Sequence, residues 1–192
     1  MNNKLDFIVI DFETANWQRN SAIQVGLVRF VGGQEVDSMV ALIKPPTTYF
    51  VEEWTKTIHG LCYEDVKDAP YFDEVWTNEV MPFINKTPNL PLVAHNATFD
   101  MSVIKGCCEY YGLDIPNIKY FDSLAIAKKV WPDVSHKLTS LGEQFNIQYR
   151  AHDALEDSRT CGKIVLIAAE EKNCNSVGLL LFTLHLTLKP LM

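Results

Sequence analysis

The pattern of apolar and polar residues predicts a sheet of short strands with helices between them. The clearest strand is the nearly continuous apolar run from Lys4 to Ile10, which should be buried on both faces in the middle of a sheet. Residues 22–31 and 36–43 are also rich in β-forming residues, and the short segment between them contains Gly32-Gly33, which predicts a hairpin. The sheet should therefore open with three antiparallel strands.

The following part of the chain alternates strands and helices. Apolar runs at 89–94 and 118–121 lead into helical patterns at 97–112 and 123–130, the order expected of parallel strands joined by helices. Further helices are predicted over 51–58, 71–84, 137–145 and onward from Asp153, where Asp153 and Glu156 fit a capping box. This order predicts an α/β fold.

The C-terminal tail has a different pattern. Residues 182–189 alternate apolar and polar side chains with period two, which predicts an added edge strand or a partner contact, with Phe182, Leu184, Leu186 and Leu188 on one face. A poorly ordered tail is the alternative. We accordingly divide the chain into a main domain, residues 1–175, and an apolar tail, residues 176–192.

Composition narrows the class of protein. At 192 residues and 47% hydrophobic, the chain suits one domain with a sizeable core. The formal net charge of −7 argues against a broad basic surface for long nucleic acid, although bound metal ions would offset clustered carboxylates locally. Five cysteines without a Cys-x-x-Cys spacing favour reduced thiols, and the N-terminus has no signal-peptide hydrophobic run. We expect a cytoplasmic protein that does not enter a membrane.

Acidic residues gather where the predicted strands and helices meet. Asp11 and Glu13 leave the first strand on one face, and Phe12 points away from them, so a hard divalent cation would fit between the two carboxylates. A solvated strand exit is the alternative. Asp100 should lie in the first turn of the helix above the sheet's carboxyl end. Asp157 should lie one turn inside the last long helix, with His152 in the loop before it.

Together these motifs resemble a known family. Asp11-Phe12-Glu13-Thr14, the segment His95–Asp100 and the segment His152–Asp157 resemble the three motifs of the DEDDh (DnaQ-like) 3′–5′ exonucleases, which include the proofreading subunit of bacterial DNA polymerase III. The stretch Ile58-His59-Gly60-Leu61 is similar to a further family segment. The resemblance covers residues 5–172 and implies a ribonuclease-H-like α/β fold, with a five-stranded mixed sheet flanked by helices.

The resemblance also implies a mechanism. Two Mg²⁺ or Mn²⁺ ions would be held by Asp11, Glu13, Asp100 and Asp157, and His152 would be the general base. The product would be a nucleoside 5′-monophosphate released from the 3′ end of DNA. The family pattern places five further residues around the terminal nucleotide: Phe12, Thr14, His59, Asn96 and Phe99.

Several alternatives stay open at this stage. From the sequence, Phe99 could equally be a core aromatic instead of a substrate contact, and His95 could equally have a structural role. Trp17 and Arg19 lie close enough in sequence to Thr14 to touch a substrate. The substrate could be RNA or a short oligonucleotide instead of DNA, or the chain could be a binding module with weak catalysis. The expected partner is the 3′ end of single-stranded DNA or RNA, with a homodimer or a polymerase subunit as protein alternatives.

Overall fold

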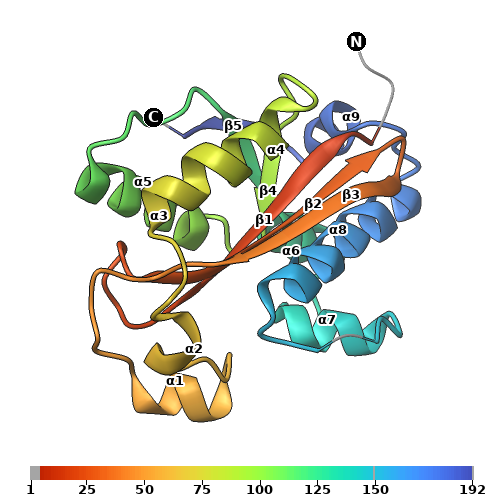
Figure 1. Ribbon diagram of the computed structural model, residues 1–192. Coiled ribbons are helices and arrows are strands. Elements are labelled where there is room, and N and C mark those ends of the chain that lie inside the picture. Colours follow the sequence, from red (N-terminus) through yellow and green to blue (C-terminus); the bar gives the residue numbers. More distant parts are fainter. Residues whose placement is uncertain (1–4, 149, 192) are drawn as a thin grey trace.

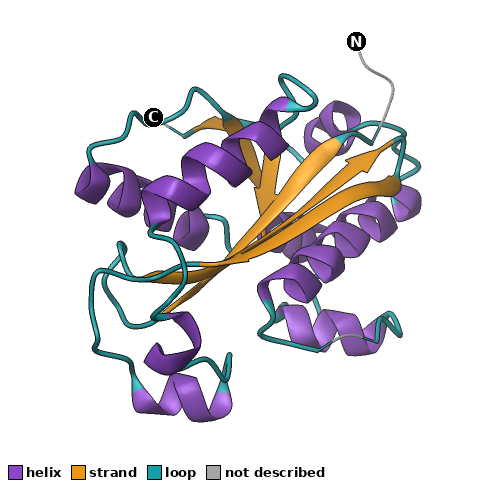
Figure 2. Cartoon of the chain, viewed as in Figure 1, coloured by secondary structure: helices purple, strands orange, loops and turns teal. Residues whose placement is uncertain are grey.

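The computed structural model describes residues 5–148 and 150–191, and its centre is a six-stranded sheet. Helices cover both faces of the sheet (Figures 1 and 2). The strands are β1 (Phe7–Thr14), β2 (Ala22–Val31), β3 (Gln34–Leu42), β4 (Leu92–Ala94), β5 (Lys119–Asp122) and β6 (Lys189–Pro190). Their order across the sheet is β3-β2-β1-β4-β5-β6. Lys4, at the start of the predicted first strand, and Met192, at the end of the tail, lie outside the described residues.

The strand directions confirm the predicted mixed sheet. Strands β1, β2 and β3 are antiparallel, and β4 and β5 then run parallel to β1. The predicted number of five strands is one too few, because the tail adds β6 antiparallel to β5. The carboxyl ends of β1 and β4 therefore meet at one edge, beside the helices that follow them.

Each of the six segments predicted to be helical contains a helix, and two further helices in the described residues lie at Tyr63–Val66 and Val177–Thr183. The helices are α1 (Glu52–Thr57), α2 (Tyr63–Val66), α3 (Phe72–Val75), the π-helical turn η1 (Trp76–Val80), α4 (Met81–Asn85), α5 (Thr98–Tyr111), α6 (Ser123–Val130), α7 (Leu138–Gln144), α8 (Ala154–Glu171) and α9 (Val177–Thr183). The predicted helix over 71–84 is formed by α3, η1 and α4 in succession. No helix in the described part of the chain has both the length and the hydropathy of a membrane span.

Strand β1 divides the hydrophobic core into two layers. Ile8, Ile10 and Phe12 face the layer that contains α3 and α5, whereas Phe7 and Val9 face the layer that contains α6, α8 and α9 (Figure 1). This strict alternation follows from the period-two geometry of a strand. It also fixes the chemistry at the strand's end, because Asp11 and Glu13 continue the face of Phe7 and Val9 toward α8.

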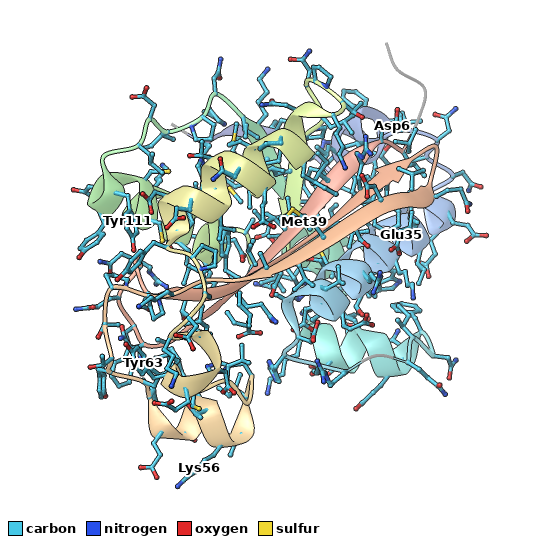
Figure 3. All side chains as sticks on the ribbon, viewed as in Figure 1. Asp6, Glu35, Met39, Lys56, Tyr63 and Tyr111 are labelled. Atoms are coloured by element: carbon cyan, nitrogen blue, oxygen red, sulfur yellow. The ribbon has the colours of Figure 1, made fainter. Side chains whose placement is uncertain are left out.

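Helix α1 lies outside the core. It has no buried residue, and Ile58, which follows its last residue, is 38% exposed. Lys56 on α1 points away from the molecule, whereas Met39 on β3 is partly buried and packs against the core (Figure 3). Helix α1 is therefore a surface element at the end of the sheet where β1 exits.

The tail corrects the sequence prediction in one respect. Helix α9 (Val177–Thr183) includes the first two residues of the segment 182–189 that was predicted to be a strand, and the Ser176 hydroxyl at its start accepts a hydrogen bond from Leu179 N at 3.2 Å. The predicted common face is also wrong, because Leu184 is buried while Phe182 is 79% exposed. Val177, Leu180, Leu181 and Leu184 have the helical spacing that buries them in the core layer that contains α6 and α8, and this burial outweighs the alternation of the residues that follow. The expected added edge strand is limited to Lys189–Pro190.

Candidate active site

The two carboxylates of β1 point into one pocket. Asp11 and Glu13 lie on the α8 side of the strand, and the Phe12 side chain lies on the opposite side at 3% exposure, 6.5 Å from the Phe72 ring. The prediction that the side chains of Asp11 and Glu13, which are two residues apart on the strand, lie on the same face is therefore confirmed. Phe12 consequently reaches the pocket through its main chain, and its aromatic ring belongs to the core.

Asp100 is fixed from the other core layer. It lies in the first turn of α5, is 1% exposed, and its Oδ1 accepts a hydrogen bond from Phe12 N at 3.1 Å. This bond joins the second acidic motif to the main chain between Asp11 and Glu13. Burial raises the pKa of Asp100 well above its usual range, and the hydrogen bond from Phe12 opposes that rise.

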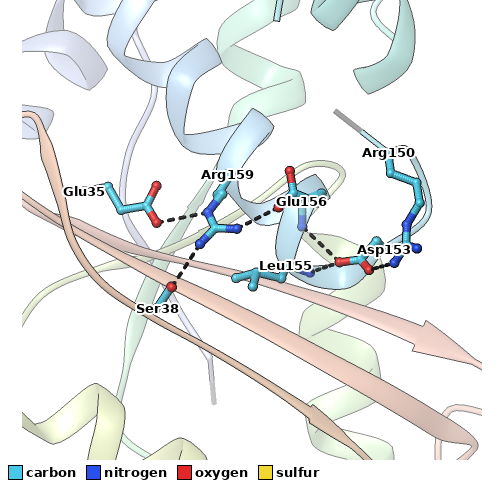
Figure 4. A network of polar contacts seen from close by, with 7 residues as sticks. All are labelled: Glu35, Ser38, Arg150, Asp153, Leu155, Glu156 and Arg159. Carbon is cyan, nitrogen blue, oxygen red and sulfur yellow. Dashed lines mark hydrogen bonds and ion pairs between the residues drawn. The ribbon is translucent and has the colours of Figure 1, made fainter. Parts of the chain in front are cut away.

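Asp157 is positioned by the cap of α8. Asp153 is the N-cap residue, and its Oδ1 accepts hydrogen bonds from Leu155 N and Glu156 N at 3.2 and 3.3 Å (Figure 4). The other half of the predicted capping box is absent, because the Glu156 carboxylate instead accepts a hydrogen bond from Arg159 at 2.6 Å (Figure 4). Asp157 lies in α8 one turn after Asp153, and the residue is 8% exposed.

His152 lies in the loop immediately before α8, as the sequence predicted. Its backbone adopts a left-handed conformation with φ 63°, and its N–H donates to Asp157 Oδ2 at 2.8 Å. Glu13, His152 and Asp157 each offer a ligand atom, and these three atoms lie within 4.8 Å of one another. The exposed imidazole is therefore beside the carboxylates and accessible to solvent.

The acidic groups strongly perturb each other. Burial raises the pKa of Glu13 to about 8, and the negative charges of Asp157 and Asp100 add to the rise. Burial likewise raises the pKa of Asp11 well above its usual range, followed by the charges of Asp100 and Glu13. Such a cluster holds protons unless a cation replaces them. An all-oxygen donor set of this kind suits Mg²⁺ or Mn²⁺.

The pocket has a volume of about 450 Å³. Its lining consists of Asp11, Phe12, Glu13, His95, Lys137, Leu138, Thr139, His152 and Asp157. Sequence reasoning missed the wall contributed by the start of α7, including the exposed Lys137, which is the N-cap residue of that helix. Nothing in the local pattern marks Lys137, because it reaches the site only through the packing of α7 against α8.

His95 connects the strand β4 to the loop before α7 by a hydrogen bond. Its Nδ1 lies 2.9 Å from Ser123 Oγ, and its Nε2 lies 2.8 Å from the carbonyl oxygen of His136. Because a carbonyl oxygen only accepts, Nε2 donates this hydrogen bond. Burial lowers the pKa of His95, which favours the neutral ring. His95 thus ties β4 to the loop before α7 and has a structural part in the pocket.

The other expected substrate residues do not line this pocket, and they fall into two groups, Thr14 with His59 and Asn96 with Phe99. Thr14 is 5% exposed at the end of β1. Burial lowers the pKa of the nearby His59, and a hydrogen bond with the Thr14 main chain opposes this lowering. The His59 ring is held by Leu61 N, which donates to Nδ1 at 3.0 Å. Asn96 is exposed, and its main-chain N–H donates to Asp122 Oδ1 at 3.0 Å. Phe99 is half-buried next to Asp100.

Comparison with known proteins identifies the family. The sequence profile of the RNase T exonuclease family matches residues 8–165, which include all three acidic motifs. The chain belongs to this exonuclease family. The resemblance to DEDDh 3′–5′ exonucleases and the enzyme class predicted from it are thereby confirmed.

A curated relative and two solved structures illustrate the likeness. The PolC-type DNA polymerase III of Caldanaerobacter subterraneus subsp. tengcongensis is 30% identical over 172 residues, which cover 86% of this chain but 12% of the polymerase. The nuclease domain of 3′hExo, a DEDDh family member bound to rAMP, has a TM-score of 0.74 at 16% identity, covering 91% of this chain and 96% of that one.

Exonuclease X in complex with 5′ overhanging duplex DNA has a TM-score of 0.69 at 20% identity, covering 87% of this chain and 93% of that one. These two likenesses show that the exonuclease domain has the ribonuclease-H-like fold implied by its motifs. The chain spans about an eighth of the length of its PolC-type relative, so the activity of that whole polymerase does not transfer with the likeness.

Proposed function

We propose that this chain is a metal-dependent exonuclease that removes nucleoside 5′-monophosphates one at a time from the 3′ end of DNA. The observation that carries the proposal is that Asp11, Glu13, Asp157 and His152 line one pocket, with the buried Asp100 close enough for its charge to raise the pKa of Asp11. The raised pKa values of Asp11, Glu13 and Asp100 support it, because the burial and repulsion that raise them are offset when cations bind to the carboxylates. The likeness to a PolC-type polymerase supports DNA as the substrate.

Two divalent ions fit this donor set. Asp11, Glu13, Asp100 and Asp157 would hold them, and the ions, when bound, supply Lewis acidity that makes a water molecule more acidic and stabilises charge on the leaving 3′-oxygen. His152 accepts the proton of the attacking water, for which its exposed position beside Glu13 and Asp157 is suitable. The hydrogen bond from His152 N to Asp157 Oδ2 holds the main chain of the proposed base next to one of the proposed metal ligands.

The remaining residues bind and orient the substrate. Thr14, His59, Asn96 and Phe99, together with the main chain of Phe12, would enclose the terminal nucleotide. Residues 1–175 would form the catalytic domain, and the tail would complete the sheet through β6. A polymerase in another chain or a second copy of this chain is the protein partner that we propose to test.

The decisive experiment measures mononucleotide release from 3′-labelled single-stranded DNA and RNA of equal sequence. We expect 5′-monophosphates from the DNA in the presence of Mg²⁺ or Mn²⁺, none after EDTA treatment, and recovery when the metal is restored. A 3′-blocked strand should resist degradation and a 5′-blocked strand should not. Full activity after demetallation, or cleavage within a closed circle, would contradict the mechanism; faster release from RNA would reassign the substrate.

A further inference from the structure

Aromatic side chains gather on the surface at the exit of β1, outside the catalytic pocket. Trp17, Tyr49 and Trp54 form this aromatic platform. Trp17 is 66% exposed and Tyr49 is 56% exposed. The Trp17 ring lies 5.6 Å from the Trp54 ring at an interplanar angle of 70°, and 6.4 Å from the Tyr49 ring at 39°. These rings contact one another but leave much of their area in solvent, which is unusual for structural aromatics.

The platform is held rigidly against the strand. The Asn16 side chain, which is 3% exposed, donates to the Tyr49 carbonyl at 2.9 Å and accepts from Gln18 N at 2.9 Å. Val51 N donates to the Ala15 carbonyl at 2.9 Å, so the loops that carry Trp17 and Tyr49 are joined at two points. A binding surface that is already ordered loses less conformational entropy when a ligand arrives.

A contact between a cation and a further ring links the loop of this platform to the helix that carries Asp100. The Arg19 guanidinium carbon lies 5.0 Å from the centre of the Phe99 ring, and Phe99 precedes Asp100 in α5. Gly106 allows this approach, because a Cβ atom there would lie 2.6 Å from Arg19 Cβ. The half-buried Phe99 ring and the exposed Arg19 guanidinium are therefore in contact, and Arg19 lies two residues along the chain from the exposed ring of Trp17.

We infer that the aromatic platform stacks the bases that precede the 3′-terminal nucleotide, so that the enzyme takes an unpaired 3′ end several nucleotides long. This inference rests on the proposed exonuclease function and extends it to a substrate class. Flat exposed rings suit bases of any sequence, and Arg19 supplies charge complementary to the phosphates between them. Bases in a duplex are already stacked on their neighbours, so the platform favours a single strand.

The test compares two oligonucleotides that differ only in their bases. One is single-stranded DNA, and the other has abasic sites at the second to fourth positions from the 3′ end. Trp17→Ala should lower kcat/KM on the intact strand by about 5- to 150-fold, the range for losing one base-stacking ring. The loss should be much smaller on the abasic strand. Trp17→Phe should recover most of the activity, and Tyr49→Ala should repeat the pattern of Trp17→Ala.

Two controls separate the inference from the proposed function. Tyr110→Ala removes an equally exposed aromatic, 56% exposed near the far end of α5, and should not distinguish the two strands. Hydrolysis of the p-nitrophenyl ester of thymidine 5′-monophosphate reports the catalytic centre without upstream bases. A wild-type protein inactive on every substrate would refute the exonuclease function. An active wild type whose Trp17→Ala and Tyr49→Ala variants, folded by circular dichroism, lose equally on intact and abasic strands would overturn the platform.

Discussion

Gly26 lies directly against the main chain of Ala154, and a Cβ atom at Gly26 would overlap the Ala154 carbonyl group. Gly26 pairs with Asp11 across β1 and β2, whereas Ala154 begins the helix that carries Asp157. Two hydrogen bonds hold the same approach, from Ser158 Oγ to the Gly26 carbonyl at 3.0 Å and from Ala154 N to Gln24 Oε1 at 3.0 Å. The absence of one side chain thus lets α8 bring its carboxylate to those of β1.

Replacing Gly26 should separate the halves of the site. Gly26→Ala is expected to lower the free energy of unfolding by about 1–3 kcal/mol through overpacking and to weaken Mn²⁺ binding, because α8 must move outward. Thermal unfolding and a calorimetric Mn²⁺ titration check this. Gly178→Ala is the matched control, since a Cβ there meets nothing within 4 Å. Equal Mn²⁺ affinity in both variants would show that the close approach does not position the site.

The raised carboxylate pKa values predict an unusual pH dependence of stability without metal. The pKa of Glu13 rises from 4.5 to about 8 on folding, so the folded state keeps a proton that the unfolded chain releases above about pH 4.5. The resulting stabilisation is complete below pH 4.5 and is lost as the pH rises through about 8. The melting temperature of the EDTA-treated protein should therefore fall between pH 5 and pH 8.

Saturating Mn²⁺ should reverse this trend. The ion relieves the repulsion in the folded state only, so its effect on the melting temperature should be larger at pH 8 than at pH 5. A change of 1 kcal/mol moves the midpoint of a domain of this size by about 2–4 °C. Glu13→Gln should flatten the pH profile of the EDTA-treated protein. A flat profile in the wild type would contradict the raised pKa.

His152 and Asp157 should differ in what their removal costs. His152→Ala is expected to lower the exonuclease rate by about 10²–10⁴-fold with nearly normal Mn²⁺ affinity, because a base is lost and the oxygen ligands remain. Added imidazole should restore part of the rate. Asp157→Asn should instead weaken Mn²⁺ binding and activity together. Since His152 lies as close to the carboxylates as a ligand would, loss of Mn²⁺ binding in His152→Ala would make it a ligand.

The tail should contribute to stability through its buried residues. Leu180→Ala in α9 should cost about 2–5 kcal/mol, because Leu180 is 0% exposed in the core layer of α8. Phe182→Ala, two residues away at 79% exposure, should change the free energy of unfolding by less than about 0.5 kcal/mol. Chemical denaturation of the two variants measures both values. Equal effects would mean that the tail does not pack on the domain in solution.

Local pattern and motif order predicted the parts of the molecule that depend on neighbouring residues. The alternation of β1 predicted that Asp11 and Glu13 share one face of the strand, opposite Phe12, and the boundaries of α6 were predicted to the residue. The position of His152 in a loop followed from the Asp153 cap. These features depend on strand geometry, capping and turn residues, which a single sequence displays directly.

Features created by distant contacts were not predicted. Gly26 looks like any weak position in a strand until α8 packs on it, and Lys137 enters the pocket wall only because α7 packs beside α8. The prediction for the tail was wrong because it used the alternation of apolar and polar side chains over residues 182–189. The helical spacing that buries Leu180 and Leu184 begins before that segment. Glu156 was predicted to take part in the capping box, but its carboxylate accepts a hydrogen bond from Arg159, which lies one turn further along the helix.

The short strand β6 also determines how the sheet can grow. Its Pro190 pairs with Lys119 and has no N–H group, so this end of the sheet offers few donors to a further strand. Within the described residues, the opposite edge is β3, which is nine residues long and exposes Val36 and Val40. A second copy that associated by adding a strand would therefore have to pair with β3, and the two sheets would then continue into each other there.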